Sequence, residues 1–277
     1  KAVSINPFDG KIRQGYTKSY MPLQFPTIVG GDFAGVILDP ADSEFKVGDE
    51  VYGQAAIYSG GSGAFAEFAA AAVNKIGLKP TNTSFSEAAA LPLVGQSALQ
   101  ALRDDIKLQQ GEKILIHGGA GGIGSAAIQI AKSMGAYVIT TVGSDDLEFA
   151  KEIGADEVID YKTEDFSAKV SDLDAVFDTA GKDETINKSF EVVKKGGIVA
   201  YMAGQPDLSL AEKYDVKAID ISTNGDTEKL ETLKKLTEDG KLKPIVDKVF
   251  ELNQVKEAFD YQETKHPRGK VVLKVKD

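Results

Sequence analysis

The chain has 277 residues, and 32 Lys and Arg against 42 Asp and Glu give it a formal net charge of −10. With no Cys and only two His, it excludes disulfides, thiolate nucleophiles and a Cys-ligated zinc site. The acidic balance argues against nucleic acid as a main ligand, because such binding needs a basic face. No run approaches the roughly 18 apolar residues of a membrane span and no signal segment opens the chain, so we predict a cytoplasmic protein without a membrane partner.

The first 94 residues contain short strand patterns separated by Gly and Pro, as in 48–53 and 63–68, which is typical of a β-rich domain. The C-terminal segment has the same β-rich character, with strand patterns at 248–250 and 269–275 on either side of a helix predicted at 252–263. We therefore predict that residues 1–94 and 244–277 form one β-rich domain.

From Lys113 onward, short β-branched runs alternate with helical stretches, which indicates a parallel sheet wrapped by helices. Strands are predicted at 113–117, 136–141, 157–160, 173–178, 197–202 and 216–222, and helices at 122–134, 145–153, 184–195 and 227–239. This order predicts an α/β fold with a doubly wound Rossmann domain over residues 95–243, separated from the β-rich domain by a cleft. The alternating charges of 226–243 predict a solvated helix face.

A glycine-rich turn follows the first of these strands. Gly119, Gly121 and Gly124 have the Gly-x-Gly-x-x-Gly spacing between a strand and a helix. The first glycine permits a tight turn, the second lets a pyrophosphate approach the backbone, and the third lets the helix pack on the strand. The context predicts a dinucleotide site formed by Gly119, Ala120, Gly121, Gly122, Ile123 and Gly124, and the alternative is a glycine-rich turn without a ligand.

The end of the second strand indicates which dinucleotide is bound. An NAD site carries an acidic residue about 20 positions after the fingerprint, on the ribose 2′-hydroxyl. This chain has Gly143 and Ser144 there, which favours NADP. The acidic pair 145–146 argues against this choice unless it caps the following helix. Tyr161 and Lys162 are placed to reach the adenine end and its phosphate, or else form a solvated turn.

The single histidine near the fingerprint has a simpler interpretation. His117 ends a core strand, so we expect a packed or hydrogen-bonded imidazole and not a general base.

Motifs along the whole chain match one family. They are Asn-Pro-Phe-Asp at 6–9, the runs at 26–35, 47–51 and 89–92, the glycine fingerprint, Gly-Ala-Asp at 154–156, and Arg-Gly-Lys-Val-Val-Leu at 268–273. The chain resembles the zinc-independent quinone oxidoreductase branch of the medium-chain dehydrogenase/reductase superfamily. Zinc-dependent relatives carry a Cys in the region of Asn6 and a His where this chain has Gly31.

The resemblance implies a chaperonin-10-like catalytic domain joined to a Rossmann domain, with NADP(H) in the cleft and hydride passing to a quinone or α,β-unsaturated carbonyl. By position it places Asn6, Tyr16 and Ser97 at the nicotinamide and substrate. Asn6 would polarise a carbonyl and Tyr16 would donate a hydrogen bond to the developing oxyanion, unless Asn6 only caps a turn and Tyr16 packs at the surface. The same reasoning places three further residues at the cofactor: Thr179, Ala203 and Gly204.

Three hypotheses for the function follow from this resemblance. The first is an NADPH-dependent, metal-free quinone or enone oxidoreductase (EC 1.6.5 or 1.3.1 type), with homodimers through the edge strand 216–222 by analogy. The alternative is an NADP-binding sensor or interaction protein without turnover. It is supported by a β-rich domain that lacks the roughly thirty opening residues of relatives, which predicts an unpaired β-edge. A zinc alcohol dehydrogenase is disfavoured by the ligand count.

Overall fold

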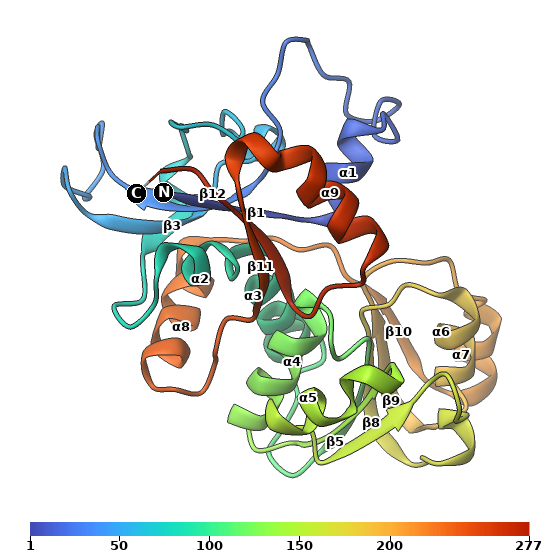
Figure 1. Cartoon of the computed structure of the whole chain (residues 1–277). Helices are drawn as coiled ribbons and strands as arrows, with labels where there is room; N and C mark the ends of the chain where they lie inside the picture. The colour runs from blue at the N-terminus through green and yellow to red at the C-terminus, as the bar shows by residue number, and fades with distance from the viewer. Residues whose placement is uncertain (277) are drawn as a thin grey trace. The chain divides into compact units, whose positions relative to one another are not determined.

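The computed structural model describes residues 1–276, which form two compact units (Figure 1). One unit is Lys1–Gln96 with the segment from Gly225 to the C-terminus, and the other is Ser97–Asn224. Within residues 1–276, no helix is long and apolar enough to cross a membrane.

The first unit is built on a six-stranded sheet with the order β11-β12-β1-β2-β3-β4. Its strands are β1 (Ala2–Ile5), β2 (Asp32–Val36), β3 (Glu50–Gln54), β4 (Ile76–Leu78), β11 (Val246–Glu251) and β12 (Lys270–Lys274). Its helices are α1 (Pro7–Arg13), α2 (Phe85–Ala89), α8 (Thr227–Glu238) and α9 (Val255–Thr264), while α3 (Pro92–Leu99) carries the chain into the second unit.

The opening strand β1 lies inside this sheet, antiparallel to both β2 and β12. Ser4 stands opposite Asp32 on one side and Val272 on the other. The sheet ends instead at β11 and β4, so the unpaired edge that we expected at the start of the chain is not at β1. This register places Asn6 directly after a central strand.

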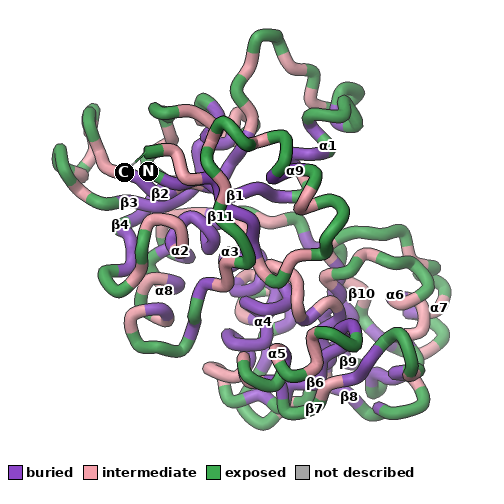
Figure 2. Tube along the Cα trace, in the orientation of Figure 1, coloured by how far each residue is buried: buried purple, intermediate pink, exposed green. Residues whose placement is uncertain are grey.

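The second unit contains a parallel sheet with the order β10-β9-β8-β5-β6-β7, which confirms the doubly wound prediction. Its strands are β5 (Lys113–His117), β6 (Tyr137–Val142), β7 (Glu157–Asp160), β8 (Leu173–Asp178), β9 (Val193–Tyr201) and β10 (Lys217–Asp220). The helices between them are α4 (Gly122–Ser133), α5 (Leu147–Glu152), α6 (Asp183–Ser189) and α7 (Leu208–Tyr214). A π-helical stretch, Gln100–Asp105, precedes the sheet. Strands β5 and β8 are buried along most of their length (Figure 2).

Two helices of this unit differ from the prediction. The helix expected over 184–195 ends at Ser189, because Val193 already pairs with Leu173 in the sheet. Helix α7 was not predicted at all, although its start is marked by Asp207, whose Oδ1 accepts from the backbone N–H of Ser209 at 3.0 Å.

The second boundary between the units lies at 224/225, in place of the predicted 243/244. Helix α8 belongs to the β-rich unit, because its buried Leu230 and Leu233 pack against two glycines there. A Cβ on Gly77 would lie 3.3 Å from Leu230, and one on Gly95 would lie 2.8 Å from Leu233. Helix α8 is therefore amphipathic, and its apolar face packs against the β-rich unit.

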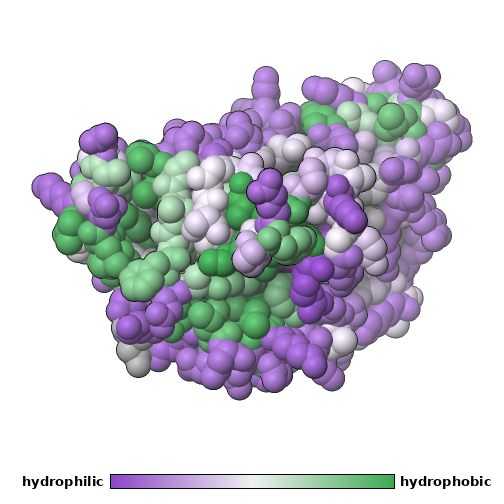
Figure 3. All heavy atoms as spheres, turned by 90° about the horizontal axis from the view of Figure 1, so that it is seen from above, coloured by the Kyte–Doolittle hydropathy of each residue, from purple (hydrophilic) through white to green (hydrophobic). Residues whose placement is uncertain are grey.

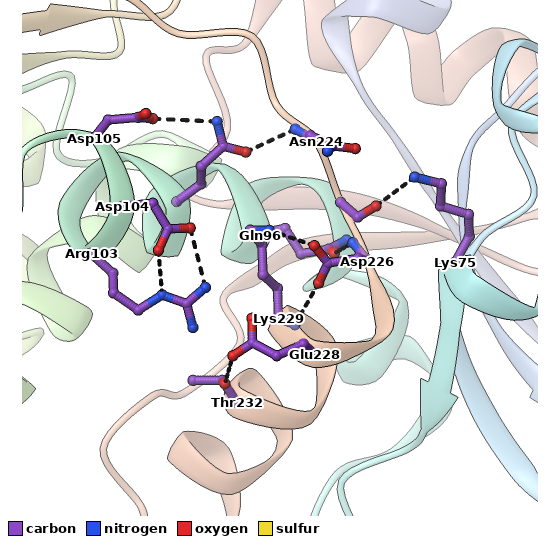
Figure 4. Close-up of polar contacts among 12 residues, drawn as sticks. Lys75, Gln96, Arg103, Asp104, Asp105, Asn224, Asp226, Glu228, Lys229 and Thr232 are labelled. Atoms are coloured by element: carbon purple, nitrogen blue, oxygen red, sulfur yellow. Dashed lines mark hydrogen bonds and ion pairs between the residues drawn. The ribbon is translucent and has the colours of Figure 1, made fainter.

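The residues that precede α8 are tied to α3 within the same unit (Figure 4). The backbone N–H of Asp226 donates to Gln96 Oε1 at 2.7 Å, and Lys229 Nζ lies 2.5 Å from Asp226 Oδ2. Lys229 is only 8% exposed, so the solvated helix face that we predicted from the charge pattern is wrong at this position.

Candidate functional site

The predicted cofactor residues follow the carboxyl ends of five parallel strands. Because these strands run in the same direction, the residues after them lie along one edge of the sheet. In sheets of this type, ligands bind in the crevice outside that edge. The segments concerned are 118–124 after β5, 143–144 after β6, 161–162 after β7, 178–181 after β8 and 202–204 after β9.

The three fingerprint glycines differ in why the fold needs them. A Cβ on Gly119 would lie 2.1 Å from Thr140 Oγ1, and one on Gly124 would lie 2.1 Å from the carbonyl oxygen of Gly118. Both positions are therefore closed by packing. A Cβ on Gly121 would meet only the Gly118 carbonyl oxygen, at 3.4 Å, and φ of Gly121 is −73°. Neither packing nor backbone strain requires glycine at position 121.

Helix α4 begins at this turn, with Gly121 as its N-cap. The helix has twelve residues, and no side chain in the described range 1–276 caps it. The first N–H groups of a helix have no intrahelical acceptor and carry partial positive charge, which suits a phosphate. The open surface above Gly121 and these N–H groups fit the pyrophosphate of a dinucleotide.

The turn after β6 meets the turn after β7. A Cβ on Gly143 would lie 3.5 Å from Lys162 Nζ and 3.6 Å from Tyr161 Oη. Ser144 Oγ donates to Asp160 Oδ2 at 2.5 Å, and this bond lowers the pKa of Asp160. The ammonium group of Lys162 is therefore the cation beside the glycine where an NAD site carries its carboxylate.

The turns after β8 and β9 complete this edge. Thr179 Oγ1 donates to the carbonyl oxygen of His117 at 2.7 Å, which fixes Thr179 against the fingerprint strand. A Cβ on Gly181 would lie 3.0 Å from Ala203, and Gly204 has φ of +101°. Asp178 accepts from the backbone N–H of Gly181 at 2.6 Å through Oδ1. Its buried Oδ2 has no hydrogen-bond partner within residues 1–276, and burial raises the pKa of this carboxyl.

Asn6 lies in the β-rich unit, in a buried polar network. Asn6 Nδ2 donates to Asp32 Oδ2 at 2.9 Å, and Lys270 Nζ donates to Asn6 Oδ1 at 2.6 Å. Asp32 Oδ1 accepts from Gln54 Nε2 at 3.0 Å and from the backbone N–H of Leu93 at 3.2 Å. Burial raises the pKa of Asp32 and lowers that of Lys270, while the charge of each favours the ionised form of the other.

This network leaves Asn6 little freedom. Its amide oxygen is bonded to a buried ammonium group and its amide nitrogen to a buried carboxylate, so one N–H remains for another acceptor. The backbone N–H of Asn6 donates to Asp9 Oδ2 at 2.8 Å at the start of α1. Asp9 is also buried, and this burial raises its pKa to about 7.

Tyr58 stands beside the network. A Cβ on Gly31 would lie 3.8 Å from Tyr58 Oη and 3.9 Å from Gln54 Nε2. The Tyr58 ring packs edge-on against Phe8, with 5.4 Å between the centroids. Burial and the charges of Asp32 and Asp9 raise the pKa of its hydroxyl.

The two other residues expected near the substrate, Tyr16 and Ser97, differ in exposure. Tyr16 follows α1 with 70% of its surface exposed. Ser97 is fully buried in the Rossmann unit, where its Oγ lies 2.7 Å from Thr223 Oγ1. Ser97 therefore has a protein partner, and Tyr16 is open to solvent.

Comparisons with known proteins agree with both units. Residues 1–81 match the alcohol dehydrogenase GroES-like domain and residues 153–273 match a zinc-binding dehydrogenase domain. The chain is 37% identical to 2-methylene-furan-3-one reductase of Solanum lycopersicum, covering 98% of this chain and 69% of that protein. It is 36% identical to the chloroplastic NADPH-dependent alkenal/one oxidoreductase of Arabidopsis thaliana, covering 98% and 70%. The structure of a quinone oxidoreductase from Coxiella burnetii superposes with a TM-score of 0.85 at 32% identity, covering 99% and 88%.

The chain belongs to the quinone oxidoreductase branch of the medium-chain dehydrogenase/reductase superfamily. The resemblance stated from its motifs is confirmed, as is the pairing of a GroES-like with a Rossmann domain.

His117 of this quinone oxidoreductase-branch chain is packed and hydrogen-bonded, as predicted. Its Nδ1 lies 2.9 Å from Thr141 Oγ1 and its Nε2 lies 3.2 Å from Ser189 Oγ. Burial lowers the imidazole pKa to about 3, so the ring stays neutral. In the described part of the chain, no three His, Asp or Glu side chains are placed to hold a metal ion.

Several groups around Asn6 were not identified from the sequence as site residues. Asp32 and Lys270 both lie inside motifs that carried the resemblance, at 26–35 and 268–273, so a signal for them was present. Gln54 and Tyr58 lie outside those motifs. The pairing of β2 with β3 brings Gln54 to Asp32, and the turn after β3 brings the Tyr58 hydroxyl beside Gly31.

Proposed function

We propose that the protein is an NADPH-dependent, metal-free oxidoreductase that reduces a quinone or an α,β-unsaturated carbonyl compound. The observation that carries the proposal is the open surface at Gly121, between two glycines that packing does require. A glycine-rich turn without a ligand explains Gly119 and Gly124 but gives no reason for Gly121. The named activities of the relatives, an alkenal/one and a quinone oxidoreductase, indicate the acceptor class.

The residues of the Rossmann unit bind and orient the dinucleotide in this proposal. The first N–H groups of α4 bind the pyrophosphate, and Gly119, Ala120, Gly122 and Ile123 form the backbone around it. The turns with Thr179, Ala203 and Gly204 border the nicotinamide half. A bound dihydronicotinamide supplies the hydride.

The side chains after β6 and β7 support NADP over NAD. Gly143 removes the carboxylate that would repel a 2′-phosphate, and Lys162 Nζ stands beside it. Tyr161, 56% exposed, offers a second donor. Ser144 is already committed to Asp160, so its backbone, more than its hydroxyl, is available to the phosphate.

In this proposal, side chains of the β-rich unit donate hydrogen bonds to the acceptor molecule. The remaining N–H of Asn6 donates to the acceptor oxygen, and Tyr16 donates to the same oxygen as negative charge develops there. The acceptor carbonyl is thereby polarised without a metal ion, since the chain has no Cys and only two His.

Two further features belong to the proposal. Within residues 1–276, strand β10 pairs only with β9, which leaves its other edge for a second copy in a homodimer. Cytoplasmic location also stays a prediction, because the alkenal/one relative is named as chloroplastic.

The test is NADPH consumption at 340 nm, with NADH in parallel, against a panel of quinones and enones with and without a chelator. We expect chelator-insensitive turnover that prefers NADPH. Loss of activity on chelation would contradict the metal-free reaction. Cofactor binding by fluorescence without any turnover would favour the alternative, an NADP-binding sensor or interaction protein.

A further inference from the structure

Two lysines from different turns lie near one tyrosine at the carboxyl edge of the Rossmann sheet. Lys182 Nζ lies over the Tyr161 ring, 5.7 Å from its centroid. Lys162 Nζ and Tyr161 Oη both lie beside Gly143, at 3.5 Å and 3.6 Å from the position of a Cβ there. Tyr161 and Lys162 follow β7, whereas Lys182 follows β8. Side chains from two separate turns therefore bring two ammonium groups to one phenol.

The contact between Lys182 and Tyr161 spans the edge where the dinucleotide is proposed to bind. In the sheet order, β5 and β6 lie between β8 and β7, and neighbouring strands are about 4.8 Å apart. The Tyr161 hydroxyl reaches back to the turn after β6. The Lys182 side chain therefore extends past the fingerprint turn, which follows β5. A dinucleotide that runs from this fingerprint to Gly143 passes beside the Lys182 ammonium group.

The backbone that carries Lys182 is fixed, and its side chain is exposed. Asp178 Oδ1 accepts from the backbone N–H of Gly181 at 2.6 Å, and Lys182 is the N-cap of helix α6. A Cβ on Gly181 would lie 3.0 Å from Ala203, so this turn is closely packed. Within residues 1–276, no carboxylate forms an ion pair with the exposed Lys182 side chain. Its ammonium group is therefore available to an anionic ligand.

The charges around Gly143 make a single lysine insufficient for a phosphate. Lys162 Nζ lies 4.0 Å from the exposed Asp145 carboxylate, and Asp160 ends the neighbouring strand β7. One ammonium group beside two carboxylates provides no excess positive charge. A phosphomonoester carries a charge of about −1.5 to −2 at pH 7, so it needs a further cation at this edge. Lys182 is placed to supply that cation.

We propose that Lys182 is a specificity-determining residue whose ammonium group leaves the Tyr161 ring and pairs with the 2′-phosphate of NADP(H), together with Lys162. The inference rests on the proposed function and deepens it, because it assigns part of the cofactor choice to the turn after β8. An exposed contact between a cation and a ring is weak, whereas an ion pair with a phosphate is a charge-assisted hydrogen bond, so the exchange favours the bound state. NAD(H) has no 2′-phosphate and leaves Lys182 on the ring.

A cation makes this distinction where an apolar surface does not. Figure 3 shows a face of the molecule on which apolar residues gather between hydrophilic borders. An apolar surface binds the adenine of NAD and NADP alike, because the two dinucleotides differ only in a phosphate. At the turns after β7 and β8, the exposed groups are instead a phenol and two ammonium groups, those of Tyr161, Lys162 and Lys182.

The experiment measures the binding of adenosine 2′,5′-bisphosphate and of 5′-AMP by calorimetry, in the wild type and in Lys182→Gln. The matched control is Lys213→Gln, which removes an exposed lysine 4.7 Å from the centroid of the Tyr214 ring on α7. We expect Lys182→Gln to bind the bisphosphate about tenfold more weakly, with the affinity for 5′-AMP unchanged. Lys213→Gln keeps both wild-type affinities, and Lys182→Arg restores the preference for the bisphosphate.

Equal weakening of both nucleotides would mean that Lys182 supports its turn without meeting the phosphate, and would overturn the inference. Unchanged affinities in Lys182→Gln, or a wild type that binds neither nucleotide, would also overturn it. Turnover separates this failure from failure of the proposed function. NADPH oxidation by 2-cyclohexen-1-one with unchanged affinities in Lys182→Gln would retain the reductase and refute the role of Lys182. A bisphosphate preference that depends on Lys182, without turnover of any quinone or enone, would retain the role and refute the reductase.

A second readout reports the ion pair at the phosphate itself. A pH titration of the ³¹P resonance of the bound 2′-phosphate gives its second pKa, which is about 6 in a free phosphomonoester. Neighbouring ammonium groups lower this pKa, because they favour the dianion. We therefore expect a higher pKa of the bound phosphate in Lys182→Gln than in the wild type. The same pKa in both proteins would show that Lys182 does not pair with the phosphate.

Discussion

The glycine turn of the Rossmann unit and the Asn6 network of the β-rich unit are built in opposite ways. The turn is formed by seven successive residues, 118–124, and offers backbone N–H groups and empty space. The network joins Asn6, Asp32, Gln54 and Lys270, which are separated by up to 264 positions in the chain, and offers charges fixed by burial. A backbone site depends on local conformation, while a side-chain site depends on the whole sheet.

Substitutions within the turn give the largest expected effect. We predict that Gly124→Val prevents folding, because its Cβ would lie 2.1 Å from a backbone oxygen, whereas Gly121→Val folds and loses cofactor binding at least about 100-fold. Thermal unfolding and NADPH fluorescence titration measure the two effects. If Gly121→Val bound NADPH normally, the turn would be structural and the proposed function would lose its main support.

The network is expected to be sensitive to loss of its cation. Lys270→Met leaves the buried Asp9 and Asp32 carboxylates without a compensating charge, and we predict a loss of about 3–5 kcal/mol in the free energy of unfolding. Urea denaturation measures it. The matched control is Lys248→Met, which changes an exposed lysine on the neighbouring strand β11. Equal stability of the two variants would mean that the network is not ionised.

Asp9 makes the network sensitive to pH. Its folded-state pKa of about 7 lies above the ordinary value of 3.8, so the native state binds this proton more tightly than the unfolded state. Its contribution to stability is therefore greatest at acidic pH and is lost as pH rises toward 7. We predict that Asp9→Asn, which keeps an acceptor for Asn6, becomes progressively more stable than the wild type between about pH 4 and 7, by about 1–3 kcal/mol at the upper end. Parallel pH profiles in urea denaturation would refute this.

The preference between NADPH and NADH tests the side chains that lie beside the turn after β6. Lys162→Gln removes the cation beside Gly143, and we predict that the preference for NADPH over NADH in kcat/KM falls about tenfold. Gly143→Asp is expected to act in the same direction, because its carboxylate would pair with Lys162 and repel a 2′-phosphate. The control is Lys151→Gln, an exposed lysine on α5 paired with Glu148. A parent enzyme that already prefers NADH would show the cofactor prediction to be wrong.

The smallest expected effect is at Tyr16. The residue is 70% exposed, so its hydroxyl is solvated before it meets a substrate. We predict that Tyr16→Phe lowers kcat severalfold, about tenfold at most. Steady-state kinetics with the same enone measures it, and an unchanged rate would remove Tyr16 from the mechanism.

The order of strands and helices in the Rossmann unit was predictable because each element has a local period and local end signals. Four of its strands, at 113–117, 157–160, 173–178 and the closely placed 137–142, lie within one residue of the predicted bounds. The role of Gly124 in packing also followed from its spacing, whereas Gly119, predicted to permit a tight turn, is required by its packing against Thr140. Helix α8 was predicted as a helix, but an apolar face does not indicate which unit the helix packs against. The predicted boundary between the two units therefore lies 19 positions too late.

By itself, the sequence determined the family, the doubly wound sheet and the backbone turn that fits a pyrophosphate, since contiguous residues encode each of them. Only the tertiary structure decided that Asn6 lies between Asp32 and Lys270, that Ser97 is bonded to Thr223, and that Tyr58 faces Gly31. The physical reason is that burial and pairing of charges depend on which strands become neighbours. That choice is set by the free energy of the whole sheet and not by any one segment.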